Sequence, residues 1–148
     1  MKRLFVFLLA LTFVFNSSNA VITIAKSMNS VLRAHIEDAG AKKYKLIISL
    51  LSDTKAIPED PVLLLKFTDN TTLELKGKRT RNEKVDMPFG FNRHNDDATF
   101  IISQKVLDKI ANGIIKFRIN TQPKYYEKSW NNGKIGKKLY KDYQKSKF

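Results

Sequence analysis

The chain has 148 residues, a formal net charge of +13 and no cysteine. The lack of cysteine excludes disulfides, a thiol nucleophile and a lipid anchor attached through a cysteine, so packing alone must hold the fold. The large positive charge favours anionic partners, although such a charge also keeps a protein soluble without any partner.

Residues 1–20 have the three parts of a secretory signal peptide. Lys2 and Arg3 precede an apolar run, and small residues end at Ala20, after which we expect cleavage. An uncleaved membrane anchor is the alternative, but the run of about 12 residues reaches only ~18 Å, whereas a bilayer core is ~30 Å thick. We therefore expect one domain, residues 21–148, exported to a periplasm or to the extracellular space. The absence of disulfides favours a bacterial setting.

Residues 44–50 carry apolar side chains at alternating positions and predict a buried strand. The preceding segment, residues 28–39, fits either a helical stripe or a short strand of a hairpin. We favour the strand because the segment is short and Gly40 is a turn signal. His35 then belongs to the core or to its rim.

Residues 62–77 predict a β-hairpin, because apolar and polar side chains alternate on both sides of Asp69 and Asn70. An odd number of turn residues gathers the apolar side chains on one face. The register that we expect opposes three pairs: Phe67 and Leu73, Leu65 and Leu75, and Lys66 and Glu74.

Residues 77–97 show no sustained period and contain Gly, Pro, Asn and Asp, so they predict a long loop with room for a short edge strand. Basic residues crowd its first half, where cations attract phosphate groups. This loop supplies the first set of candidate contacts for an anionic partner: Lys78, Arg79, Arg81 and Lys84.

Residues 98–121 predict a strand, a short helix and a second strand. Ser103 is the expected N-cap of the helix and Gly113 its end. In the second strand we expect Ile115, Phe117 and Ile119 to point inward.

From Ile135 the sequence predicts a basic amphipathic helix whose narrow apolar seam also contains Leu139 and Tyr143. We favour docking of this seam on a sheet. The alternative is a membrane surface where Trp130 and Tyr140 join the lysines. Lysines on and beside the polar face are the second set of candidate contacts: Lys134, Lys137, Lys138 and Lys141.

These elements describe a small α+β domain: an antiparallel sheet of about five or six strands, one short crossing helix and a C-terminal basic helix. A β-sandwich with a bridging helix is the alternative, because periodicity does not determine strand order.

The favoured function is a non-enzymatic binding or accessory domain whose basic surface meets an anionic envelope polymer, an acidic lipid surface or an acidic protein; nucleic acid is less favoured. No catalytic residue, metal site or cofactor is predicted, because the chain lacks a nucleophile elbow, a phosphate-binding glycine loop and clustered metal ligands. One alternative is a polymer-acting envelope hydrolase that uses His94 with the loop carboxylates Asp96 and Asp97. Another is a structural or interaction module whose charge only maintains solubility.

Overall fold

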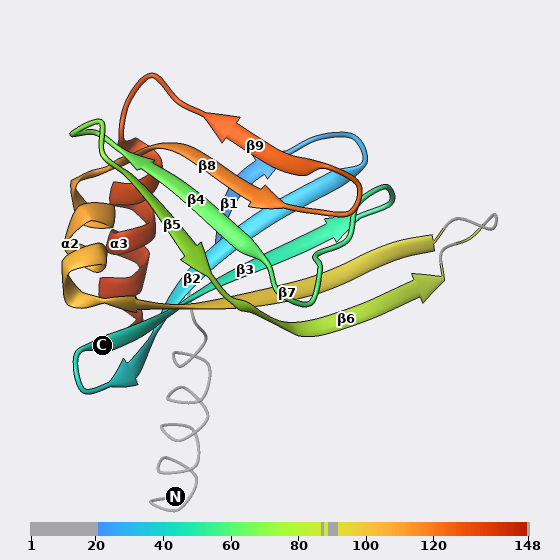
Figure 1. The fold of residues 1–148 in the computed structure, drawn as a ribbon, viewed down its shortest axis with the longest axis horizontal. Coiled ribbons are helices and arrows are strands. Elements are labelled where there is room, and N and C mark those ends of the chain that lie inside the picture. Colours follow the sequence, from blue (N-terminus) through green and yellow to red (C-terminus); the bar gives the residue numbers. More distant parts are fainter. Residues whose placement is uncertain (1–20, 87, 89–91, 148) are drawn as a thin grey trace, which may run out of the picture.

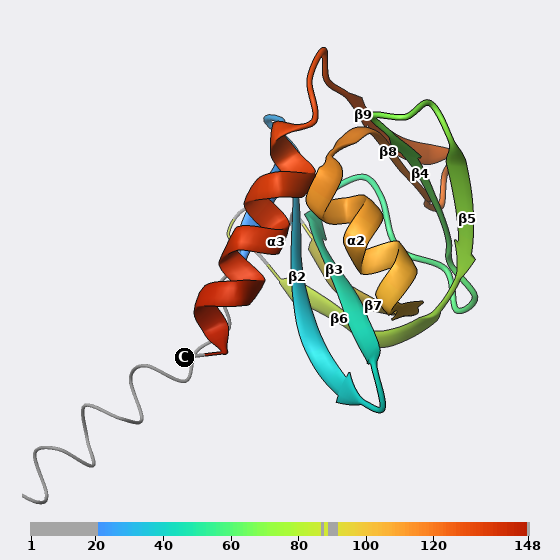
Figure 2. The same cartoon turned by 90° about the vertical axis from the view of Figure 1, so that its left-hand side faces the viewer.

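The structure is a computed structural model that describes residues 21–86, 88 and 92–147. Within them, nine strands form two antiparallel sheets around a shared core, and two helices cover one end (Figures 1 and 2). The five-stranded sheet has the order β1-β2-β3-β7-β6 and consists of β1 (Ile22–Lys26), β2 (Ser30–Gly40), β3 (Lys43–Ser52), β6 (Lys78–Asp86) and β7 (Asn92–Ser103). The four-stranded sheet has the order β5-β4-β8-β9 and consists of β4 (Val62–Phe67), β5 (Thr72–Lys76), β8 (Ile114–Asn120) and β9 (Tyr125–Ser129). The helices are α2 (Gln104–Asn112) and α3 (Lys134–Ser146).

The protein therefore has a β-rich α+β fold, which is the class that the sequence predicts. The expected single sheet of about five or six strands is wrong, because the strands divide between two sheets. The alternative, a sandwich with a bridging helix, is closer, since α2 follows β7 of one sheet and precedes β8 of the other. The expected cleavage site at Ala20 lies outside the described residues.

The hydrophobic core lies between the two sheets and extends to the helical end. β3 buries alternate side chains, as its pattern predicts, and removal of each large apolar side chain from water contributes roughly 1.5–3 kcal/mol. The buried side chains of β3 are Tyr44, Leu46, Ile48 and Leu50. Those of β4 and β8 are Leu63, Leu65, Phe67, Ile114, Phe117 and Ile119. The helices add Leu107, Ile110, Leu139 and Tyr143.

Residues 30–40 form strand β2, which agrees with the favoured interpretation of this segment. β2 pairs with β3 so that Ala34 lies opposite Ile48 and Arg33 opposite Ser49. Ala34 and Ile48 are fully buried, whereas Arg33 is exposed, so alternation places Arg33 and Ser49 on the outer face of the sheet.

The β4–β5 hairpin keeps the predicted faces but not the predicted register. Leu65 lies opposite Leu73, and the expected pairing of Leu65 with Leu75 is wrong by two residues. The turn is tighter than expected because the amide of Thr71 donates to the Asp69 carboxylate at 2.9 Å and Asn70 adopts a left-handed φ of 66°. A shift by two residues leaves every side chain on its original face.

The prediction of a long loop over residues 77–97 is wrong, because β6 and the beginning of β7 pair within this segment, but the edge strand that the prediction allowed is present as β6. β6 is an edge strand with almost entirely exposed side chains, so it leaves no apolar period in the sequence. Gly77 joins β5 to β6, where the chain passes from one sheet to the other. A Cβ at this position would lie 2.6 Å from Phe100 Cδ1, so the close approach of the strands requires glycine.

The ends of α2 follow the sequence signals. The amide of Val106 donates to Ser103 Oγ at 3.3 Å, which confirms the predicted N-cap. Gly113 ends the helix with a φ of 128°, a conformation that favours glycine. In β8 the fully buried positions include Ile114 rather than the expected Ile115, because the pairing with β4 shifts at an irregularity.

Candidate functional site

The C-terminal helix is docked on the fold through its apolar seam. Leu139 and Tyr143 are buried, and Ile135 is half-buried against the core. The Tyr143 ring packs edge-on against Tyr44 of β3, with ring centroids 5.8 Å apart. The docked arrangement favoured by the sequence is therefore present, and Figure 2 shows α3 beside α2 at the end of the sheets.

Docking leaves the lysines of α3 on the surface. All four candidate residues are exposed, and none forms an ion pair within the described part of the chain. They are Lys134, Lys137, Lys138 and Lys141. We call these four residues the α3 lysine face. Trp130 and Tyr140 do not extend it with exposed rings, because both are half-buried against the core.

The other four candidate residues lie on strand β6 rather than in a loop. Lys78 pairs with Asp60, and Arg79 Nη1 donates to the carbonyl oxygen of Ile57 at 3.0 Å. Arg81 Nε lies 3.4 Å from an Asp97 carboxylate oxygen. Neighbouring carboxylates therefore offset part of the positive charge of β6.

Lys84 is exposed on β6 and lies opposite His94 in the ladder with β7. Figure 1 shows that β6 runs towards the end of the molecule away from α3. The structure thus keeps the two predicted basic sets apart instead of joining them in one surface.

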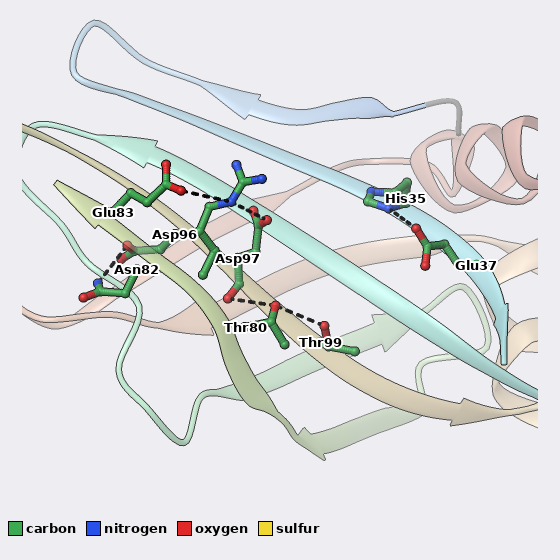
Figure 3. Close-up of polar contacts among 9 residues, drawn as sticks. His35, Glu37, Thr80, Asn82, Glu83, Asp96, Asp97 and Thr99 are labelled. Carbon is green, nitrogen blue, oxygen red and sulfur yellow. Dashed lines mark hydrogen bonds and ion pairs between the residues drawn. The ribbon is translucent and has the colours of Figure 1, made fainter. Parts of the chain in front are cut away.

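The carboxylates proposed for a hydrolase lie on opposite faces of β7. Asp96 points inward, is fully buried, and accepts hydrogen bonds from the Ile57 amide at 2.8 Å and from Asn82 Nδ2 at 2.9 Å. Asp97 points outward (Figure 3), and its Oδ2 lies 3.4 Å from Arg81 Nε. Asp96 thereby fixes the segment between β3 and β4, which explains its burial without catalysis.

Sequence reasoning missed a second polar site on the outer face of the five-stranded sheet. A hollow of about 380 Å³ opens there across β2, β3, β7 and β6. Strand pairing aligns Arg33, Ser49, Asp97 and Arg81 in one row across this face. The other lining residues are Val21, Val31, His35, Leu51 and Asn95. The i, i+2 spacing of Arg33 and His35 is visible in the sequence, but only the strand order brings Asn95 beside them.

His35 lines this hollow on the outer face of the sheet, whereas the sequence places it in the core or at the rim of the core. Its Nε2 is 3.1 Å from Glu37 Oε1, and its side chain is 14% exposed. Figure 3 shows His35 and Glu37 on β2, with Asp97 on β7, which is separated from β2 by β3. The other ring nitrogen, Nδ1, is buried and has no hydrogen-bond partner.

Within the described residues, no group of three or more His, Cys, Asp or Glu side chains is arranged to hold a metal ion. None of the helices in this part of the chain is long and apolar enough to cross a membrane. Comparison of the chain with protein-family models, curated proteins and solved structures finds no match.

Proposed function

We propose that the protein is an exported, non-enzymatic binding domain that meets an anionic partner through the α3 lysine face. The observation that carries this proposal is the contrast between the two basic sets. On β6, Lys78, Arg79 and Arg81 have carboxylate or carbonyl partners, whereas the four α3 lysines are exposed and without ion pairs within the described residues. Unpaired cations keep their full attraction for an external anion.

Export rests on the signal-peptide pattern of residues 1–20. The first described strand begins at Ile22, which is buried in the core. Cleavage after Ala20 would therefore remove no strand or helix of the described domain.

The spacing of the α3 lysines suits a linear polyanion. Lys134, Lys138 and Lys141 follow at intervals of four and three residues, so they lie on one side of the helix. A rise of 1.5 Å per residue separates them by about 4.5–6 Å along the axis. A phosphate-rich envelope polymer offers negative charges along its length, and the counterions released on binding would make the affinity strongly dependent on salt.

The test measures retention of the exported protein on a phosphate-rich glycopolymer, on vesicles with acidic lipids and on nucleic acid at increasing salt. The variant is K137E/K138E/K141E, and the control is K26E/K76E/K128E, which makes the same charge change at exposed positions on β1, β5 and β9. A lysine near an anionic surface contributes about 1 kcal/mol, so the α3 variant should lose about 100-fold or more in affinity for the polymer.

The control should bind nearly as well as the unmodified protein. Equal losses in both variants would mean that only total charge matters, and unchanged binding in both would reduce the α3 lysines to a solubilising role. Preference for vesicles over the polymer would reassign the partner to a lipid surface.

A further inference from the structure

The hollow on the outer sheet face gathers polar side chains that the fold leaves without partners. His35 Nδ1 is buried and unbonded. In the described part of the chain, the side chains of Arg33, Ser49 and Asn95 also form no hydrogen bond or ion pair, although all three line the hollow. A buried polar atom normally has a partner, so the unbonded Nδ1 of His35, next to the exposed Arg33 and the half-buried Ser49 and Asn95, points to a site for a polar ligand.

The charged side chains around the hollow indicate which net charge the ligand should carry. Arg33 and Arg81 contribute two positive charges, while Asp97 contributes one negative charge and lies 3.4 Å from Arg81. Among the described residues that line the hollow, the free cation is therefore Arg33. A ligand with one negative charge matches this balance, whereas a dianion would also face the Asp97 carboxylate.

The other polar side chains of the hollow favour a ligand that carries hydroxyl groups. In the tautomer that donates its Nε2 hydrogen to Glu37, the Nδ1 atom of His35 is a hydrogen-bond acceptor. Ser49 and Asn95 each offer both a donor and an acceptor, which is the pattern that neighbouring sugar hydroxyls satisfy. Val31 and Leu51 add apolar surface for the carbon atoms of a ring.

We infer that this hollow binds a hydroxycarboxylate of the hexuronate type. Arg33 holds the carboxylate through paired hydrogen bonds, and His35, Ser49 and Asn95 contact the hydroxyls. The volume of about 380 Å³ falls within the usual range for small-molecule sites and holds one sugar ring. The inference does not depend on the α3 lysine face, which lies on a different element.

The experiment is an NMR titration of the full chain with glucuronate, glucose and inorganic phosphate. Glucuronate should shift the signals of Arg33, His35 and Asn95 in a saturable way. Because glucose lacks the carboxylate, it should bind about tenfold more weakly or worse, and phosphate should not displace glucuronate. Arg33→Gln should weaken glucuronate binding by about tenfold or more, since it removes the charged fork.

The matched control is Lys43→Gln, which removes the same charge from an exposed position of β3 outside the hollow. It should leave the affinity for glucuronate unchanged, as should K137E/K138E/K141E. The inference is overturned if no saturable shift occurs, if both single variants bind alike, or if phosphate or glucose binds as tightly as glucuronate. Shifts confined to the α3 lysines would likewise overturn it, without affecting the proposed function of that helix.

Discussion

Asp96 and Asp97 are adjacent residues with opposite surroundings. Asp96 is fully buried and accepts two hydrogen bonds, whereas Asp97 faces outward to the half-exposed Arg81. Asp96→Asn replaces one acceptor oxygen with an NH₂ group, which leaves the Ile57 amide or Asn82 without its partner. We expect the free energy of unfolding to fall by about 1–3 kcal/mol, the usual cost of an unpaired buried donor.

Asp97→Asn is the matched control, because it makes the same chemical change one residue away. It removes only a surface ion pair, so the loss should be less than about 1 kcal/mol. Urea denaturation of both variants measures the difference. Equal stabilities would show that the Asp96 hydrogen bonds do not hold the segment between β3 and β4.

The Asp69 carboxylate lies in the β4–β5 turn, as the sequence predicts from its turn residues. The pKa of Asp69 lies below its ordinary value of 3.8 because the hydroxyl and the amide of Thr71 donate to the carboxylate. A lowered pKa in the folded protein means that the turn is stabilised above the ordinary pKa and loses this stabilisation as pH falls through the lowered value.

Thr71→Val removes the hydroxyl and retains the amide, so the pKa of Asp69 should rise towards its ordinary value. An NMR titration that follows the carboxyl carbon of Asp69 measures this change. Thr72→Val, on an exposed neighbouring residue, should leave the pKa of Asp69 in place. If the two variants titrate alike, the Thr71 hydroxyl does not lower the pKa of Asp69.

At the level of elements, the sequence predicts those strands and helices that bury one face. β3, α2 and α3 each show a clear apolar period, and all three are present. β6 and β9 lie at sheet edges with largely exposed or half-buried side chains, so no period marks them. β1 is different, because Ile22 and Ile24 alternate in the sequence and would have supported a strand.

Gly136 sets how closely α3 approaches its neighbours. A Cβ at this position would lie 2.5 Å from the carbonyl oxygen of Ile110 and 2.7 Å from the amide of Ile114. Gly136→Ala improves helix propensity by about 1 kcal/mol, but the clash with rigid backbone costs more. We expect a net loss of about 1–2 kcal/mol in the free energy of unfolding.

Denaturation measurements on Gly136→Ala test this expectation, with Lys141→Ala as a control at an exposed position of the same helix. The control should change stability little. If Gly136→Ala is instead more stable than the unmodified protein, propensity outweighs packing and α3 does not need the close approach.

For the whole molecule, composition predicted the charge but not its distribution. The sequence marks two basic sets, and only the fold shows that β6 cations form ion pairs, such as Arg81 with Asp97, while the four candidate lysines of α3 form none within the described residues. The hollow on the outer face could not be predicted from the sequence either, because it also depends on how the strands are arranged in space. Its residues come from four strands, and their meeting depends on the order β2-β3-β7-β6, which no local pattern encodes.

The same distribution determines how the protein would meet an anionic surface. The apolar seam of α3 is buried against the rest of the fold. The helix therefore presents lysines to an anionic surface, but no fully exposed apolar side chain that could insert into lipid. The chain contains one tryptophan, Trp130, which is half-buried against the core and lies four residues before α3 begins, so we use its emission as the reporter. On vesicles with acidic lipids, we expect any binding to be electrostatic, with no blue shift of Trp130 emission and complete release at high salt.

Fluorescence with a sedimentation assay tests this expectation, and neutral vesicles provide the baseline. A blue shift that persists together with binding at high salt would mean that α3 leaves its docking site and inserts its seam into the lipid. The free energy gained by moving Leu139 and Tyr143 from the core into the bilayer would then have to exceed the free-energy cost of exposing the surface that they cover. Since both side chains are already removed from water in the docked state, insertion gains little apolar burial, and the docked helix should remain the bound form.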